Sequence, residues 1–236
     1  MDPRYRPERT SMADCVGEPF MKTFTGLRDD VYRRPLVTAL DRIDLAEGWT
    51  CVDVGAGGGE VSVALAEVVG ASGRIFSVDN DPLARDEVAE RAAKFAQVFA
   101  ITQAGEDLSL PMPVDLAVCR FLLLHVVDPA RVLLKMASAI RPGGSLVVQE
   151  PITSAGRIDG SPFSYPEARH PDIGAFLPAL VRSAGLEVID AWAEAPAGAG
   201  PGLVASYVES ITGVDPGDDS IVLPPLVTVV ARKPAN

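Results

Sequence analysis

The sequence has few of the residues that build metal knuckles and disulfide frameworks. It holds three cysteines and two histidines in 236 residues, and Cys15, Cys51 and Cys119 lie far apart. Both kinds of structure need cysteines in close, regular pairs. Cys51 and Cys119 each lie in an apolar run, so we expect buried thiols there and no metal site.

Basic residues and long apolar runs are also scarce. Lys and Arg number 21 against 32 Asp and Glu, which gives a net charge of −11. Nucleic-acid binding depends on basic side chains that neutralise phosphates, so we expect no nucleic-acid partner. No apolar run reaches the roughly 18 residues of a membrane span, and Met1–Glu8 lacks the apolar core of a signal peptide. We therefore expect a cytoplasmic protein with no membrane partner.

One stretch, Thr50–Val61, holds four glycines within five positions between an apolar run and an amphipathic segment. We expect a strand, a tight turn and a helix. Glycine permits positive φ and close approach of a ligand, and the first turn of a helix offers free N–H groups. A nucleotide-like ligand fits this arrangement. The plainer alternative is a turn that only joins a strand to a helix.

Strand and helix patterns alternate along the rest of the chain, which predicts a parallel sheet covered on both faces. Ligands bind such sheets outside the carboxyl ends of the strands. The segment Pro151–Pro171 follows one of these ends and is predicted to be a loop that caps the substrate. The expected strands are Cys51–Val54, Arg74–Val78, Gln97–Thr102, Val114–Arg120, Ser145–Glu150, Leu186–Trp192 and Leu226–Lys233; the expected helices are one or two within Gly26–Leu45, then Glu60–Val69, Asp81–Ala96, Pro129–Ile140, Asp172–Ala184 and Leu203–Ile211.

The glycine spacing departs from the dinucleotide fingerprint G-x-G-x-x-G, because Glu60 occupies the place of the third glycine. A third glycine comes one residue earlier, at Gly59, and Asp53 stands two residues before Gly55. This D-x-G-x-G-x-G pattern resembles motif I of the class I S-adenosylmethionine-dependent methyltransferases.

Further landmarks resemble the same family in the same order. Asp79 ends the second strand, Gly105–Pro111 resembles the family's G-D-A-E-x-L-P turn, and Arg120–Pro129 with Arg141–Gly144 resembles its later segment. The resemblance implies an α/β, Rossmann-like three-layer sandwich. Its mostly parallel seven-stranded sheet would have the order 3-2-1-4-5-7-6, with the last strand antiparallel and an N-terminal helical lid. We expect a single domain with an arm and helices over 1–46, a cofactor-binding half over 47–150, and a substrate cap with C-terminal strands over 151–236.

The resemblance also implies roles for individual residues toward S-adenosylmethionine. A carboxylate suits a ribose because it accepts hydrogen bonds from two hydroxyls. Three adjacent oxygen ligands over 79–81 also suggest a metal site, but the calcium-loop pattern is missing. The implied roles are Gly55, Gly57 and Gly59 against the methionine and ribose, Asp53 orienting the loop and the amino group, Asp79 on the ribose with Asn80 beside the adenine, Glu106 and Asp107 at the adenine edge, and the backbone around Arg120 at the methionine end.

Candidates for the chemistry itself are fewer. A sulfonium is already a good leaving group, so the protein mainly aligns a nucleophile and excludes water. A base helps when the acceptor is a hydroxyl. The candidate bases are His125, Glu150 and His170, although His125 also suits a structural role and His170 a surface position. Phe163 and Tyr165 would stack on the acceptor or close the cap over the core.

These patterns together predict an enzyme that transfers a methyl group from S-adenosylmethionine to an O, N or C nucleophile of a small molecule. The alternative is a protein of the same fold that binds the cofactor but catalyses another reaction or only binds. A nicotinamide oxidoreductase is disfavoured by Glu60. A homodimer is left open.

Overall fold

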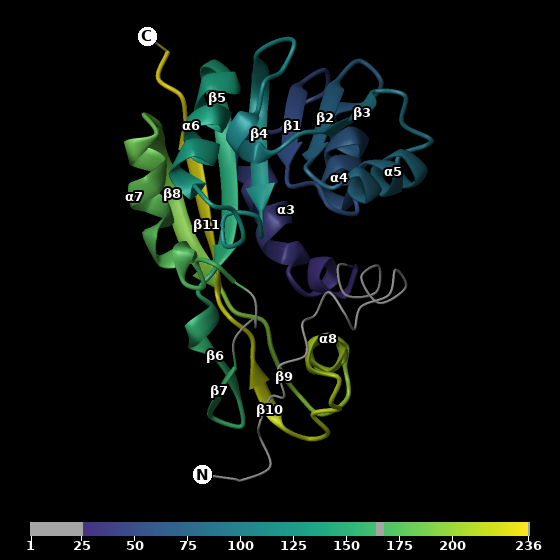
Figure 1. Ribbon diagram of the computed structural model, residues 1–236, viewed down its shortest axis with the longest axis vertical. Helices are drawn as coiled ribbons and strands as arrows, with labels where there is room; N and C mark the ends of the chain where they lie inside the picture. Colours follow the sequence, from purple (N-terminus) through teal and green to yellow (C-terminus); the bar gives the residue numbers. More distant parts are fainter. Residues whose placement is uncertain (1–25, 164–167, 236) are drawn as a thin grey trace.

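The computed structural model of the chain describes residues 26–163 and 168–235 (Figure 1). Seven strands form a main sheet in the order β3-β2-β1-β4-β5-β11-β8. The first five pair in parallel, whereas β11 is antiparallel to both β5 and β8. The bounds are β1 Thr50–Val54, β2 Arg74–Asp79, β3 Val98–Thr102, β4 Val114–Arg120, β5 Ile140–Pro151, β8 Glu187–Glu194 and β11 Leu226–Arg232. In the order of these seven strands along the chain the sheet is 3-2-1-4-5-7-6, so the predicted fold class, strand order and antiparallel last strand are confirmed.

Helices cover both faces of this sheet and make three layers. On one face, α3 (Arg33–Arg42) and α4 (Glu60–Val69) bury their apolar sides in one core cluster, and α5 (Pro82–Arg91) packs on β2 and β3. On the other face, α6 (Pro129–Ala139) and α7 (Leu177–Ser183) pack in a second cluster. Each fully buried leucine in these clusters contributes roughly 1.5–3 kcal/mol of transfer free energy. The thiols of Cys51 and Cys119 are buried, as expected.

Local signals account for where these helices begin. Asp81 caps α5 by accepting the N–H of Leu83 at 2.9 Å, and Asp128 caps α6 by accepting the N–H of Arg131 at 2.9 Å. A proline occupies the first turn of both helices. Proline needs no N–H there, and the caps satisfy donors that would otherwise have no partner. The predicted starts of these helices are therefore confirmed.

Three boundaries differ from the expectation. The segment expected as one helix over Asp172–Ala184 is a 3-10 turn, Ile173–Phe176, followed by α7 from Leu177. The helix after Pro82 ends at Arg91 instead of near Ala96. The strand expected over Ser145–Glu150 begins earlier, at Ile140, because Ile140 pairs with Val114 and a register shift follows that pair. Pro142, Gly143 and Gly144 are typical of a turn, but here they lie within β5, where the pairing with β4 is irregular.

A second, four-stranded sheet lies beyond the carboxyl ends of β4 and β5, at the bottom of Figure 1. Its order is β7-β6-β10-β9, and α8 (Leu203–Thr212) contacts it. The expectation of a plain loop over Pro151–Pro171 is therefore wrong. Strands of three residues are too short to show an alternating pattern, which is why the sequence did not reveal them. The strands are β6 Gly156–Ile158, β7 Ser161–Phe163, β9 Ala197–Ala199 and β10 Ser220–Val222, with 3-10 turns at η2 Thr153–Ala155 and η3 Ile173–Phe176.

The N-terminal helices expected within Gly26–Leu45 are present. Residues 26–31 are helical, Tyr32 forms a turn, and α3 follows. The arm expected before them lies outside the described residues, as does Tyr165. Across the described part of the chain, every helix is too short or too polar to cross a membrane.

Candidate functional site

The glycine turn connects β1 to α4 with three residues in the left-handed region. The φ angles are +76° at Gly55, +49° at Gly57 and +83° at Gly59. A Cβ on Gly55 would lie 2.9 Å from the Cβ of Leu122, whereas a Cβ on Gly57 would meet no atom within 4 Å. Gly55 is therefore required by packing against Leu122. Gly57 faces open space, where a ligand can approach the backbone.

Asp79 is held against this turn from the end of β2. Its Oδ2 accepts the N–H of Gly57 at 2.9 Å, and its Oδ1 accepts the N–H of Asp81 at 3.0 Å. The residue is half-buried, and Asn80 beside it is exposed. A carboxylate can accept about four hydrogen bonds, so these two leave room for hydroxyl donors from a ligand.

Asp53 lies beneath the turn instead of at its surface. It is 1 % exposed, and its Oδ2 accepts a hydrogen bond from the Oγ of Ser62 at 2.7 Å. Ser62 in turn shares a 2.7 Å hydrogen bond with Ser77 on β2. Burial raises the pKa of Asp53 to about 7, although Ser62 and the charge of Arg120 oppose this rise. The carboxyl group ties β1, α4 and β2 together below the glycines.

Glu60, which replaces the fingerprint glycine, has its own partner. Its carboxylate pairs with the guanidinium of Arg91 at 2.7 Å, and Arg91 also donates to the carbonyl of Gly58 at 2.6 Å. Burial raises the pKa of Glu60, and the charge of Arg91 opposes that rise. This pair joins the start of α4 to the end of α5, so the turn is held from α5 as well as from β2.

Arg120, at the end of β4, is turned toward the N-terminal residues. Its Nη2 donates to the carbonyl of Tyr32 at 3.0 Å, and its Nη1 lies 3.4 Å from Asp29. Burial lowers the pKa of this guanidinium, and the charge of Asp29 opposes that effect. Residues 29–32 therefore cover the end of β4. Nothing in the sequence singled out Asp29 or Tyr32, because both contacts join residues far apart in the chain.

The acidic pair after β3 lies at the same edge. Arg131 of α6 donates to the carbonyl of Glu106 at 2.8 Å and to the carboxylate of Asp107 at 2.9 Å. The Glu106 carboxylate accepts the N–H of Val127 at 3.3 Å. The side chain of Asp107 is exposed and faces Arg131. Of the two, Glu106 is the one bonded to the loop that follows β4.

Glu150 was expected as a candidate base at the carboxyl edge of the sheet, but it is not open to an acceptor. It is fully buried, and it accepts the N–H groups of Leu122 at 2.8 Å, Leu123 at 2.7 Å and Leu124 at 3.3 Å. Burial raises the pKa of Glu150 to about 7, while these N–H donors oppose the rise. The turn after β4 folds back over the end of β5 and covers the carboxylate, so Glu150 cannot reach an acceptor.

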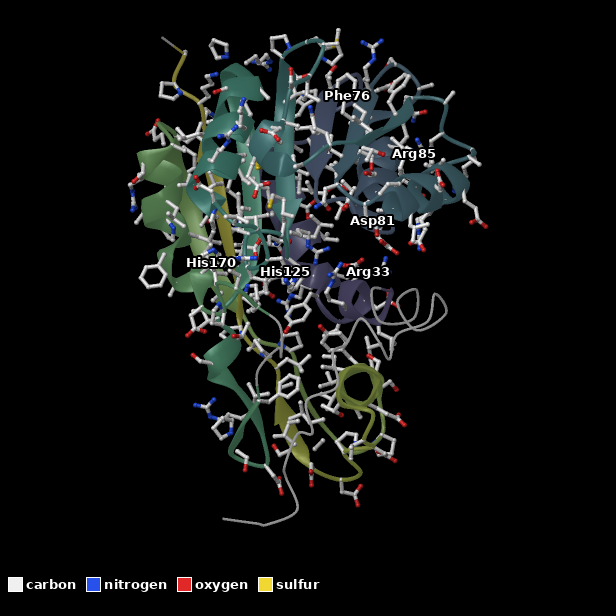
Figure 2. All side chains as sticks on the ribbon, viewed as in Figure 1. Arg33, Phe76, Asp81, Arg85, His125 and His170 are labelled. Atoms are coloured by element: carbon white, nitrogen blue, oxygen red, sulfur yellow. The ribbon has the colours of Figure 1, made fainter. Side chains whose placement is uncertain are left out.

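The same turn brings the two histidines to one place (Figure 2). His125 ends the turn, is exposed, and donates its backbone N–H to the carbonyl of Leu122 at 2.9 Å. His170 donates its backbone N–H to the carbonyl of Leu124 at 2.9 Å. The Nε2 atom of His170 is buried and has no hydrogen-bond partner among the described residues. Both histidines therefore flank the edge where the main sheet meets the second sheet.

Of the two aromatic candidates of the cap, Phe163 lies among the described residues and Tyr165 does not. Phe163 lies on β7, is 6 % exposed and belongs to the core cluster that also contains α6. It therefore closes the cap over the core, the second of the two expected roles. Within residues 26–163 and 168–235, no group of three or more His, Cys, Asp or Glu side chains is arranged to hold a metal ion.

Comparisons with known proteins bear on the domain type and the fold of the chain. Residues 52–148 match the family model described as a methyltransferase domain. The chain is 32% identical over 125 residues to an uncharacterized 37.1 kDa protein in transposon TN4556 of Streptomyces fradiae, covering 51% of this chain and 35% of that protein. It is 30% identical over 111 residues to a demethylmenaquinone methyltransferase of Bacillus licheniformis, covering 46% and 47%. It is 32% identical over 108 residues to a ubiquinone biosynthesis O-methyltransferase of Xanthomonas euvesicatoria, covering 44% and 44%. The chain thus spans less than half of each of these relatives.

Solved structures share the fold over most of the chain. A SAM-dependent methyltransferase from Aquifex aeolicus matches with a TM-score of 0.58 and 17% identity, over 84% of this chain and 88% of that one. The [4+2]-cyclase SpnF matches with a TM-score of 0.63 and 20% identity, over 86% and 82%. At these identities the likeness shows the common fold.

Proposed function

Because residues 52–148 are a methyltransferase domain of the class I S-adenosylmethionine-dependent family, we propose that this chain binds S-adenosylmethionine along Gly55–Gly59 and transfers its methyl group to a small molecule. The observation that carries the proposal is the pairing of the open Gly57 with Asp79, whose carboxylate lies 2.9 Å from the Gly57 nitrogen. A backbone that a ligand can approach and a carboxylate with unused acceptor capacity suit a nucleoside. S-adenosylhomocysteine would be the product.

We propose a role for each cofactor residue that agrees with where it lies. Asp79 would accept the ribose hydroxyls, and Asn80 and Glu106 would lie near the adenine. Two exposed apolar side chains support that position. Leu83 (59 % exposed) lies in the first turn of α5, shortly after Asp79, and Val127 (70 % exposed) donates its backbone N–H to the Glu106 carboxylate. Burying such side chains against a base is favourable. Asp53 would act from below, by keeping the turn in place.

The methionine end would lie over Gly55 and the end of β4, under residues 28–32. Bound S-adenosylmethionine supplies an activated methyl group, since its sulfonium is a good leaving group. The chain's part is then to align the acceptor and to exclude water. Asp29 and Tyr32, which cover Arg120, are placed to close this end, in keeping with an N-terminal helical lid.

His125 and His170 are our candidates for a base. An oxygen acceptor would have to lose a proton, and imidazole suits that task near neutral pH. His125 ends the turn Phe121–His125, and His170 donates its backbone N–H to the carbonyl of Leu124 in that turn. His170 also has a buried ring nitrogen without a partner among the described residues. Glu150 has no open face toward an acceptor, so we do not propose it as a base.

The acceptor is proposed to be a small aromatic molecule. Two relatives are named for demethylmenaquinone and for ubiquinone biosynthesis, which are quinone pathways. The second sheet and the described part of the cap, over 151–163 and 168–235, would contact this acceptor. A cytoplasmic location and a homodimer stay predictions.

Calorimetry of the full chain with S-adenosylhomocysteine tests the central proposal. We expect binding, and we expect Asp79→Ala to weaken it at least tenfold because the ribose loses its acceptor. Asp86→Ala, an exposed carboxylate on α5 that pairs with Arg85, is the matched control and should bind like the parent. No binding by the parent chain would contradict the proposal.

The alternative function is a reaction other than methyl transfer in the same fold. The fold is compatible with it, because a [4+2]-cyclase shares this fold. Incubation with methyl-labelled cofactor and quinone precursors separates the two functions. Label in the organic product supports methyl transfer, whereas a changed product without label supports the alternative.

A further inference from the structure

We propose that Glu150 is a positioning residue: its buried carboxylate fixes the turn Phe121–His125 and thereby the surface against which the cofactor turn packs. This inference rests on the proposed function, because its readout is cofactor affinity. Three consecutive backbone N–H groups, those of Leu122, Leu123 and Leu124, point to this one side chain. Such convergence on a fully buried group defines the shape of a loop, because buried donors need acceptors.

The turn has a backbone that local sequence does not favour. Phe121 has a φ of +50°, a region that side chains other than glycine rarely occupy. Its own N–H donates to the carbonyl of Gln149 at 3.0 Å, next to Glu150 on β5. The end of β5 therefore holds four successive N–H groups of the turn. A strained conformation persists only where the surroundings impose it, and Glu150 supplies most of those contacts.

The turn contacts the proposed cofactor site at Leu122. The position of a Cβ on Gly55 is 2.9 Å from the Cβ of Leu122 and 3.0 Å from its two methyl carbons. The side chain of Leu122 thus forms the surface beneath the first glycine. The backbone N–H of Gly55 donates to the carbonyl of Val78 at 2.8 Å. Gly55 is thus held between β2 and Leu122, and a displaced Leu122 would disturb the turn between β1 and α4. Glu150 acts on the cofactor through this contact.

The candidate bases depend on the same turn. Its carbonyls at Leu122 and Leu124 accept the backbone N–H groups of His125 and His170. One carboxylate therefore sets the place of the glycine turn on one side and of both imidazoles on the other. A positioning role of this kind affects binding and alignment together, without contact between Glu150 and a reacting atom.

The charges around Glu150 make this role dependent on pH. The Cys119 thiol lies 3.9 Å away, and its pKa is raised by burial, so it stays neutral and can donate. Burial raises the pKa of Glu150 to about 7. The charge of Arg28, from the N-terminal helix, opposes this rise because it favours the carboxylate form of Glu150. The ionised group accepts all three N–H bonds. The protonated group has a hydroxyl in place of one acceptor, so the turn is held less firmly.

The experiment compares Glu150→Gln with the parent chain, by calorimetry with S-adenosylhomocysteine from pH 5.5 to 8.5. We expect the affinity of the parent to rise with pH, and that of the variant to be about tenfold weaker at pH 8.5 with a flatter pH profile. Asp53, whose pKa is also raised to about 7, accounts for the slope that remains. Thr228→Val is the matched control: it removes the buried 2.9 Å hydrogen bond that the Gln149 side chain donates next to Glu150, and this bond does not involve the N–H groups of the turn. It should lower the melting temperature and leave the affinity unchanged.

The outcomes separate the two proposals. A parent that binds no cofactor at any pH contradicts the proposed function. A folded Glu150→Gln that binds like the parent over the whole pH range overturns the positioning role. If Glu150→Gln does not fold, Leu122→Ala takes its place, because it keeps the carboxylate and removes the contact with Gly55. That variant should bind more weakly with the pH profile of the parent, and unchanged affinity would again overturn the inference.

Discussion

The carboxyl edge of the main sheet has two sides that are held by different contacts. On the β1–β2 side, carboxylates accept short hydrogen bonds from nearby residues: Asp53 from Ser62, nine positions away, and Asp79 from Gly57, 22 positions away. On the side of the second sheet, the Tyr32 hydroxyl donates to the carbonyl of Pro224 at 2.9 Å, across 192 positions. Charge and local chain geometry fix the first side, and distant contacts fix the second.

Aromatic rings pack against one another on that second side. Tyr32 meets Phe121 edge-on with ring centroids 5.3 Å apart, and Tyr207 of α8 with centroids 6.2 Å apart. Such pairs contribute through apolar area and ring geometry, without net charge. Because the glycine turn belongs to both the fold and the proposed cofactor site, changes near it should alter stability and cofactor affinity together. Changes in the hydrogen bond that joins the Tyr32 hydroxyl to Pro224 should alter stability alone.

The largest expected effect is that of Gly55→Ala. The new methyl group would lie 2.9 Å from Leu122 at a φ of +76°, so it adds overpacking to backbone strain. We expect a loss of about 3 kcal/mol in the free energy of unfolding and at least a hundredfold loss in S-adenosylhomocysteine affinity. Urea unfolding and calorimetry measure the two. Gly57→Ala, with no atom within 4 Å, should lose only about 1 kcal/mol from strain. Equal losses in stability would contradict the packing role of Gly55.

The next effect concerns the pH dependence of folding. Burial raises the pKa of Glu150 from 4.5 to about 7, so the folded chain holds this proton more tightly than the unfolded chain. The stabilisation is present below pH 4.5 and is lost as the pH rises through about 7. Between pH 5.5 and 8 the parent should therefore lose about 2 kcal/mol more than Glu150→Gln. Cofactor affinity should change in the opposite direction over the same range.

Urea unfolding of both proteins at four pH values tests this expectation. Asp53 has the same sign, because burial raises its pKa from 3.8 to about 7, and it is present in both proteins. The difference between the two curves therefore isolates Glu150. Parallel curves would show that the carboxyl group titrates as it does in the unfolded chain.

The cofactor side of the fold could be predicted because its signals are local. Four glycines follow an apolar strand, and Asp81 and Asp128 each precede a proline at the start of a helix. These signals need no knowledge of distant residues. The alternation of strands and helices predicted that Asp79 lies at a carboxyl end, and the strand order that the resemblance implies put this end next to the glycine turn. Its bond to Gly57 agrees with that placement.

The second sheet and the burial of Glu150 could not be predicted, because distant residues create them. β6 and β10 pair Ile158 with Ile221, and each strand has only three residues. A carboxylate at the end of a strand indicated an open edge, but the turn after β4 covers it. The pairing of Arg120 with Asp29 likewise joins residues 91 positions apart. Sequence patterns show which residues reach the edge and do not show which of them the chain then covers.

The smallest effect should come from Tyr32→Phe. The change removes one hydroxyl and leaves the Pro224 carbonyl without this donor, while both ring contacts remain. We expect a loss of about 1 kcal/mol in the free energy of unfolding. Val37→Ala is the control, because the Val37 side chain on α3 is half-exposed. Its free energy of unfolding should stay within about 0.5 kcal/mol of that of the parent. S-adenosylhomocysteine affinity should be unchanged, since the ring still covers the end of β4. A tenfold weaker affinity would show that the hydroxyl of Tyr32 also shapes the cofactor side, and the distinction between the two sides would then not hold.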